Sequence, residues 1–207
     1  MVQWAMKGMS LRDEDQAREI LWPRGLVCNW GRAARGIPVD KISERLTPES
    51  IRTHVDGFST IDPLTKKKFF EESPYISLSS GTVERDSVNR ANHIYTARRT
   101  AMQFGSRFGE SDTAYIFTCW VLVAPRMAAE IYGVAEEVRN LTVYPSYSDF
   151  ADQGEIAAKL HIPANQIERC EKWVRKAPRE AYEPAWVVKN EGRFIPPERL
   201  SSVRDLL

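Results

Sequence analysis

The sequence predicts a single α+β domain, and three observations support this fold class. The chain has 207 residues, of which 43% are hydrophobic and 28% are charged, so it is long enough to form one sizeable core. Segments with helical spacing come first along the chain, whereas segments with strand character dominate later. No internal repeat and no long linker divides the sequence, so we expect one domain over residues 1–207. Helices followed by strands are typical of an α+β architecture.

Capping signals and helical periodicity predict the elements at the beginning of the chain. Ser10 and Asp13 form an S-x-x-D capping signal, and Pro23 with Gly25 ends the segment that follows. The expected elements are a helix at 11–21 within an amino-terminal helical segment at 1–25, a strand at 26–33, a short helix at 39–46 and another that begins at Thr47-Pro48-Glu49.

Strand patterns dominate the remainder. Residues 74–80 alternate between polar and apolar side chains, as a half-buried strand does, and a longer helix at 86–104 is expected to stop at Gly105. The apolar run at 114–124 predicts a buried central strand. The other expected elements are a helix at 128–138, a strand at 141–144, a loop at 145–153, strands at 155–162 and 167–174, an edge strand at 186–189, and a tail or short helix within 190–207.

Composition excludes several classes of function. The net charge of +1 gives no overall field for nucleic acid or an anionic membrane. The longest apolar run is too short to span a bilayer, and the first residues lack the apolar core of a secretory signal, so we expect a cytoplasmic type of protein without a membrane partner. Cys28, Cys119 and Cys170 are far apart and predict buried or inert thiols.

Common catalytic motifs are absent from the sequence. It contains no G-x-G-x-x-G, no phosphate-binding P-loop, no H-E-x-x-H and no G-x-S-x-G turn. His54, His93 and His161 occur singly, without the spacing of metal ligands on one helix face. We therefore expect no metal site, and a structural or surface role for each histidine.

Three polar features remain, each within an expected strand or at one of its ends. Arg32 lies near the end of the first strand, Tyr75-Ile76-Ser77-Leu78-Ser79 forms the second, and Gln153-Gly154-Glu155 opens a later one. This ordered set resembles the mono-ADP-ribosyltransferases of the cholera and pertussis toxin group, whose signatures are an Arg, a Y-V-S-T-S strand and an E-x-E or Q-x-E turn. The resemblance spans about residues 32–167.

Two positions depart from that family pattern. Leu78 stands where threonine is usual, and the family's opening strand, L-Y-R-x-D-S-R, has only a loose counterpart at residues 27–35. Arg32 is the better match for the family arginine and Arg35 follows it. If the register instead starts at Leu26, Cys28 replaces that arginine.

The resemblance implies an ADP-ribosyltransferase-like fold, with two facing, mostly antiparallel sheets that form an NAD cleft flanked by helices. It implies NAD as co-substrate and no metal. Glu155 would stabilise the cationic ribose while nicotinamide leaves, and Gln153 would orient the nucleophile. The implied NAD-binding residues are Arg32, Arg35, Tyr75, Ser77 and Ser79, and the implied acceptor-recognition residues are Phe150 and Tyr147.

Several functional alternatives stay open at this point. In the family, Q-x-E occurs with acceptors other than arginine, so a nucleic acid base or an Asn or Cys side chain is expected, on either a nucleic acid or a protein. An NAD glycohydrolase would use the same cleft with water as acceptor, and a binding module would keep the fold without catalysis. The resemblance also implies a toxin or effector that is delivered into a target cell, with an immunity or antitoxin protein as a partner.

Overall fold

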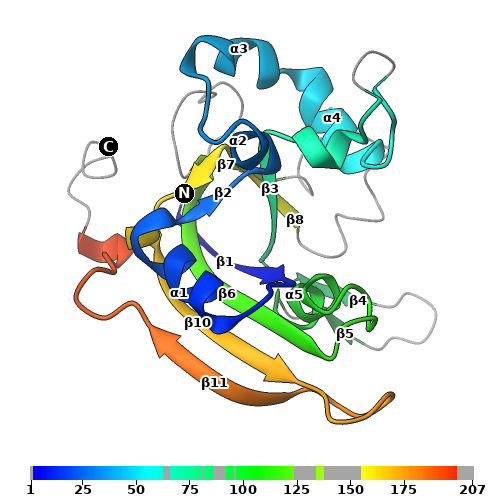
Figure 1. Cartoon of the computed structure of the whole chain (residues 1–207), viewed down its shortest axis with the longest axis vertical. Coiled ribbons are helices and arrows are strands. Elements are labelled where there is room, and N and C mark those ends of the chain that lie inside the picture. Colours follow the sequence, from blue (N-terminus) through cyan, green and yellow to red (C-terminus); the bar gives the residue numbers. More distant parts are fainter. Residues whose placement is uncertain are drawn as a thin grey trace.

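A computed structural model describes residues 2–62, 66–80, 82–85, 92–95, 97–123, 134–137 and 155–199. Its centre is a strongly curved sheet, with α3 (Ile42–Arg45) and α4 (Pro48–Asp56) gathered at one end and α5 (Ala97–Gly105) at the side (Figure 1). The remaining helices are α1 (Glu14–Glu19), α2 (Asn29–Ala33), a π-helical turn at Ile20–Arg24, and short 3-10 turns at Val39–Lys41, Phe69–Glu72, Ala164–Gln166 and Pro197–Arg199. No helix in the described ranges is long and apolar enough to cross a membrane.

Seven strands form the large sheet in the order β1-β3-β8-β7-β6-β10-β11. Their bounds are β1 (Val2–Met9), β3 (Tyr75–Ser79), β8 (Glu155–Lys159), β7 (Val134–Glu137), β6 (Thr113–Val123), β10 (Ile167–Val174) and β11 (Glu183–Lys189). Neighbouring strands are antiparallel except for the parallel pair β6 and β7. Two small sheets pair β2 (Leu26–Val27) with β9 (His161–Ile162) and β4 (Thr82–Arg85) with β5 (Asn92–Tyr95).

The large sheet closes on itself because β1 pairs with two strands. β1 runs antiparallel to β6 from Val2 opposite Leu122 to Met9 opposite Tyr115, and Met6 also pairs with Ser79 of β3. The expected α+β class and mostly antiparallel pairing are therefore confirmed. The expectation of two facing sheets needs a correction, since the facing halves belong to one continuous sheet.

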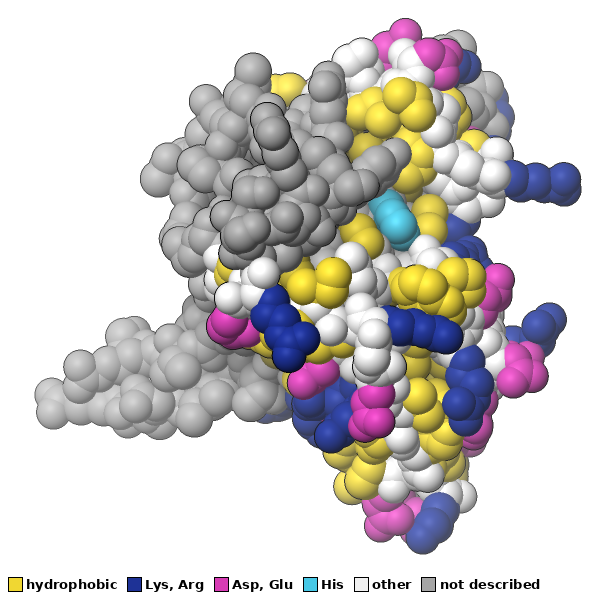
Figure 2. All heavy atoms as spheres, turned by 90° about the vertical axis from the view of Figure 1, so that its left-hand side faces the viewer, with side chains coloured by type: hydrophobic (Ala, Val, Ile, Leu, Met, Phe, Trp, Pro, Cys, Tyr) yellow, Lys and Arg dark blue, Asp and Glu magenta, His cyan; other side chains and the backbone are white. Residues whose placement is uncertain are grey.

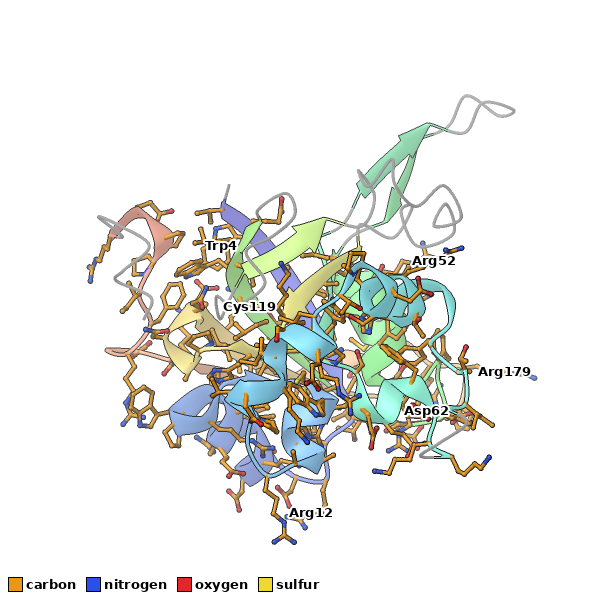
Figure 3. The ribbon with its side chains drawn as sticks, turned by 90° about the horizontal axis from the view of Figure 1, so that it is seen from above. Trp4, Arg12, Arg52, Asp62, Cys119 and Arg179 are labelled. Atoms are coloured by element: carbon orange, nitrogen blue, oxygen red, sulfur yellow. The ribbon has the colours of Figure 1, made fainter. Side chains whose placement is uncertain are left out.

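The core lies between this curved sheet and the amino-terminal helix. Strand β6 is its centre, with Tyr115, Phe117 and Trp120 almost completely buried. Burial of each such side chain contributes roughly 1.5–3 kcal/mol to stability. Helix α5 packs so closely on β1 that a Cβ on Gly8 would lie 1.7 Å from the carbonyl oxygen of Ala101. The expected free, buried thiols are confirmed at Cys28, Cys119 and Cys170; Cys119 lies inside the body whereas Arg12 and Arg52 project from it (Figure 3).

Several predicted elements are confirmed. Thr47 caps α4 in a reciprocal capping box with Ser50. The strand at 75–79, the central strand at 113–123, the strand at 167–174 and the edge strand at 183–189 all occur where the sequence places them. In each case the local pattern agrees with the burial that the tertiary structure imposes.

Other predictions were wrong, mostly where long-range pairing overrides local pattern. Residues 2–9 form β1, so the amino-terminal segment is not wholly helical, and Asp13 itself caps α1 by accepting from the backbone N–H of Gln16. The expected strand at 26–33 divides into β2 and α2, residues 92–95 of the expected helix at 86–104 form β5, and part of the expected helix at 128–138 is β7. The expected strand at 155–162 breaks at Leu160, which has φ 60°. The expected elements at 141–153 and the tail beyond residue 199 lie outside the described residues.

Candidate functional site

Strand β3 has two faces, and one of them carries the candidate site. Ile76 and Leu78 belong to the main core, together with Ile156 and Ala158 of β8. Tyr75 instead packs with Ala157 and with α4 on the opposite face. Because side chains alternate along a strand, positions 77 and 79 share the face of Tyr75. The predicted alternation of this strand is therefore confirmed: one face is apolar and packs on the core, and the other face carries the serines and lies toward α4.

The register of β8 brings the predicted catalytic position next to this polar face. Ser79 pairs directly with Glu155, and Ser77 pairs with Ala157. Directly paired residues of antiparallel strands lie on the same face, so position 155 falls on the face of Ser77 and Ser79. The Glu155 side chain lies outside the described part of the structure, as do residues Gln153, Phe150 and Tyr147.

A histidine that the sequence gave no reason to select connects α4 to this face. His54 Nε2 lies 2.9 Å from Ser77 Oγ, and His54 Nδ1 lies 2.8 Å from Ser73 Oγ. Burial, together with the positive charge of Lys7, lowers the pKa of His54 to about 3, so the imidazole is neutral at physiological pH. This burial agrees with the expected structural role of His54, and the ring also contacts a site residue directly.

A cavity of about 180 Å³ opens beside the pair of Ser77 and His54. Tyr75, Ser77 and Arg32 line it, so the structure brings together three of the residues predicted from the sequence. Ser79 lines a smaller neighbouring cavity. Arg35 is exposed at φ 58° and does not line either of them.

Two cationic side chains reach the cavity from different elements. Lys7 comes from β1 and is half-buried, whereas Arg32 comes from α2 and is exposed. Cys28 holds the start of α2, because its sulfur accepts a hydrogen bond from the N–H of Gly31 at 3.3 Å. The premise for choosing Arg32, a strand over residues 26–33, was wrong, yet the residue still lines the cavity.

Lys7 was missed because residues 2–9 were assigned to an amino-terminal helical segment and not to a strand. The alternation of Val2, Trp4 and Met6 with less apolar residues is a period-2 signal that could have identified this strand. The first strand of the sheet is therefore β1, and its cation at the cavity is Lys7.

Phenylalanines form part of the cavity wall and were also missed. Phe58 and Phe70 stack with ring centroids 5.1 Å apart, and Phe58 also contacts the ring of His54 edge-on. Phe104, at the end of α5, lines the same cavity and is 41% exposed. Exposed rings beside a cavity suit a flat aromatic ligand. Within the described ranges, no group of three or more His, Cys, Asp or Glu residues could hold a metal ion.

Comparison with known proteins supports the fold. No protein-family model and no curated protein sequence matches the chain. The solved structure named EcPltA is similar over 94% of this chain and 89% of its own, with 12% identity and a TM-score of 0.50. A mutant of heat-labile enterotoxin is similar over 87% of this chain and 73% of its own, with 16% identity and a TM-score of 0.41. The chain has the α+β fold of the ADP-ribosyltransferase toxins, as the sequence motifs predicted.

Proposed function

We propose that this protein is a mono-ADP-ribosyltransferase, which cleaves NAD, releases nicotinamide and transfers ADP-ribose to a macromolecular acceptor. The observation that carries the proposal is the pairing of Glu155 with Ser79 beside the cavity of Ser77 and His54. The fold supports the same activity. A carboxylate at this position would face the sugar from which nicotinamide departs.

The cavity fits an anionic dinucleotide in its charge and in its aromatic wall. Its volume suits one ring of NAD, so the rest of the dinucleotide would extend along the open rim. Lys7 and Arg32 would bind the pyrophosphate, for which the planar guanidinium of Arg32 is well shaped. Lys7 lies on the opening strand, where the toxin group has arginine. Its ammonium offers a single charge and lacks the planar, two-pronged donor geometry of a guanidinium. Tyr75 and the exposed phenylalanines would contact the nicotinamide.

The proposed reaction breaks the bond between nicotinamide nitrogen and ribose C1′, and the bonding electrons leave with nicotinamide. The sugar becomes cationic as this bond lengthens, and the carboxylate of Glu155 would stabilise it. A single group of this kind contributes roughly 3 kcal/mol, or 10²–10³ in rate. The acceptor nucleophile then bonds to C1′ and loses its proton, and Gln153 would orient that nucleophile.

The Q-x-E sequence favours an acceptor other than arginine, either a nucleic acid base or an Asn or Cys side chain. Basic and acidic side chains are interspersed on the face shown in Figure 2. On that face, therefore, charge favours neither a nucleic acid nor a protein acceptor.

The direct test is incubation with NAD labelled in the ADP-ribose part and a lysate separated into protein, DNA and RNA fractions. We expect nicotinamide release and label in one fraction, which names the acceptor class. Glu155→Gln should abolish both, whereas the matched control Glu191→Gln, at an exposed turn after β11, should keep them. Free ADP-ribose alone would indicate a glycohydrolase, and no turnover by the wild type would contradict the proposal.

A further inference from the structure

Ser73 and Ser77 occupy the two nitrogens of the His54 ring. Ser73 Oγ lies 2.8 Å from Nδ1, and Ser77 Oγ lies 2.9 Å from Nε2. Both serines line the cavity, but Ser73 is only 1% exposed, whereas Ser77 is half-buried. The imidazole therefore joins an inner hydroxyl to one that can reach a ligand.

The hydrogen bonds of the Ser73 hydroxyl determine the direction in which it bonds to His54. Ser73 Oγ accepts a hydrogen bond from the backbone N–H of Tyr75 at 3.2 Å. A serine hydroxyl has one proton to donate and two lone pairs to accept with. If His54 Nδ1 also donated to Ser73 Oγ, the proton of Ser73 would have no acceptor among the described residues, and the 1% exposure of Ser73 leaves it almost no contact with water. The Ser73 hydroxyl therefore donates to Nδ1.

The direction of the second hydrogen bond follows from the first. A neutral imidazole carries one proton, and an Nδ1 that accepts from Ser73 leaves that proton on Nε2. Nε2–H then donates to Ser77 Oγ. The hydroxyl proton of Ser77 cannot point back at His54, and it meets no other acceptor within the described ranges, so it is available to a ligand in the cavity that Ser77 lines.

We propose that Ser73 is a positioning residue that fixes the Nε2–H tautomer of His54 and thereby makes Ser77 a hydrogen-bond donor to the ligand in the cavity. The group that Ser77 binds is then an oxygen acceptor, such as a ribose, phosphate or carboxylate oxygen, and not an ammonium or amide N–H. The tautomer follows from the contacts of Ser73, His54 and Tyr75 alone. That the ligand is NAD rests on the proposed function.

The tautomer can be measured on the full-length wild-type protein by long-range ¹H–¹⁵N correlation at neutral pH. The ring nitrogen that correlates with Hδ2 identifies Nε2, and its ¹⁵N shift reports whether it carries the proton. His54→Gln assigns the signals by removing them. We expect a protonated Nε2 and an unprotonated Nδ1; a protonated Nδ1 would overturn the proposal. This measurement needs no Ser73 variant, so it decides the tautomer even if Ser73→Ala fails to fold.

The effect on the ligand is tested by titrating NAD calorimetrically into the wild type, Ser73→Ala and Ser73→Thr. We expect Ser73→Ala to weaken NAD binding about tenfold, the value of one hydrogen bond, and to shift the His54 Nδ1 signal. Ser73→Thr, which keeps the hydroxyl, should restore both. A folded Ser73→Ala with wild-type NAD affinity and ring signals would overturn the positioning role. If the wild type binds no NAD but shows the Nε2–H tautomer, the proposed function fails and the tautomer assignment stands.

Discussion

The buried neutral His54 predicts a specific dependence of stability on pH. Its pKa falls from the ordinary 6.5 to about 3 in the folded protein, mainly because burial disfavours the charged ring and also because Lys7 is close. The unfolded chain therefore binds a proton at this residue below pH 6.5, while the folded chain does not until about pH 3. The stability conferred by the neutral ring is complete above pH 6.5 and is lost as the pH falls toward 3.

The magnitude follows from linkage. One proton taken up only by the unfolded state lowers the free energy of unfolding by about 1.4 kcal/mol per pH unit. Between pH 7.5 and pH 4.5, above most of the range in which carboxyl groups titrate, His54 should account for about 3 kcal/mol. Burial also lowers the pKa of His161, which acts in the same direction.

Urea denaturation of the wild type and of His54→Gln at several pH values separates these contributions. His161 and the other titrating groups are common to both proteins, so they cancel in the difference between the two. His54→Gln is expected to be less stable at pH 7.5, and the gap should narrow by about 3 kcal/mol by pH 4.5 because only the wild type loses the contribution of the neutral ring. A gap that stays constant between these pH values would refute a buried, neutral His54.

Three further predictions concern the framework and the cavity. Gly8→Ala should destabilise the protein by more than about 2 kcal/mol in urea denaturation, because its Cβ would meet the backbone of α5, and wild-type stability would contradict the β1–α5 contact. Glu171→Gln should cost about 1.5–3 kcal/mol, since this buried carboxylate accepts charge-assisted hydrogen bonds from Arg98 and Arg169, while the exposed control Glu183→Gln should change stability by less than about 1 kcal/mol. Lys7→Met should weaken NAD binding by about tenfold or more in calorimetry without loss of fold, and unchanged affinity would exclude Lys7 from the ligand site.

Elements with a strong local pattern could be predicted from the sequence. The capping box of α4 satisfies backbone N–H groups with nearby residues, and the alternation along β3 matches the two faces of that strand. The local sequence pattern was therefore sufficient to predict both elements. Residues 92–95 and 134–137 instead became strands, because their pairing partners, β4 for the first and β6 and β8 for the second, determine their conformation more than their own helical spacing does.

The candidate site was predicted only in part, for a similar reason. The order of Ser77, Ser79 and Glu155 can be read along the chain, and their pairing in β3 and β8 agrees with it. His54 and Lys7 gave no local signal of a site. Their place at the site depends on the packing of α4 on β3 and on the pairing of β1 with β3.

The sequence by itself determined the α+β class and the strand that carries the two serines, because both depend on spacings of two to four residues. The tertiary structure decided which cations and which histidine line the cavity with Ser77, because the gathering of residues 7, 32, 54 and 77 around it depends on strand pairing and packing across the described chain. It also decided the proton arrangement at His54, since burial of Ser73 and of the imidazole, which no local pattern encodes, removes the water that would otherwise satisfy either tautomer.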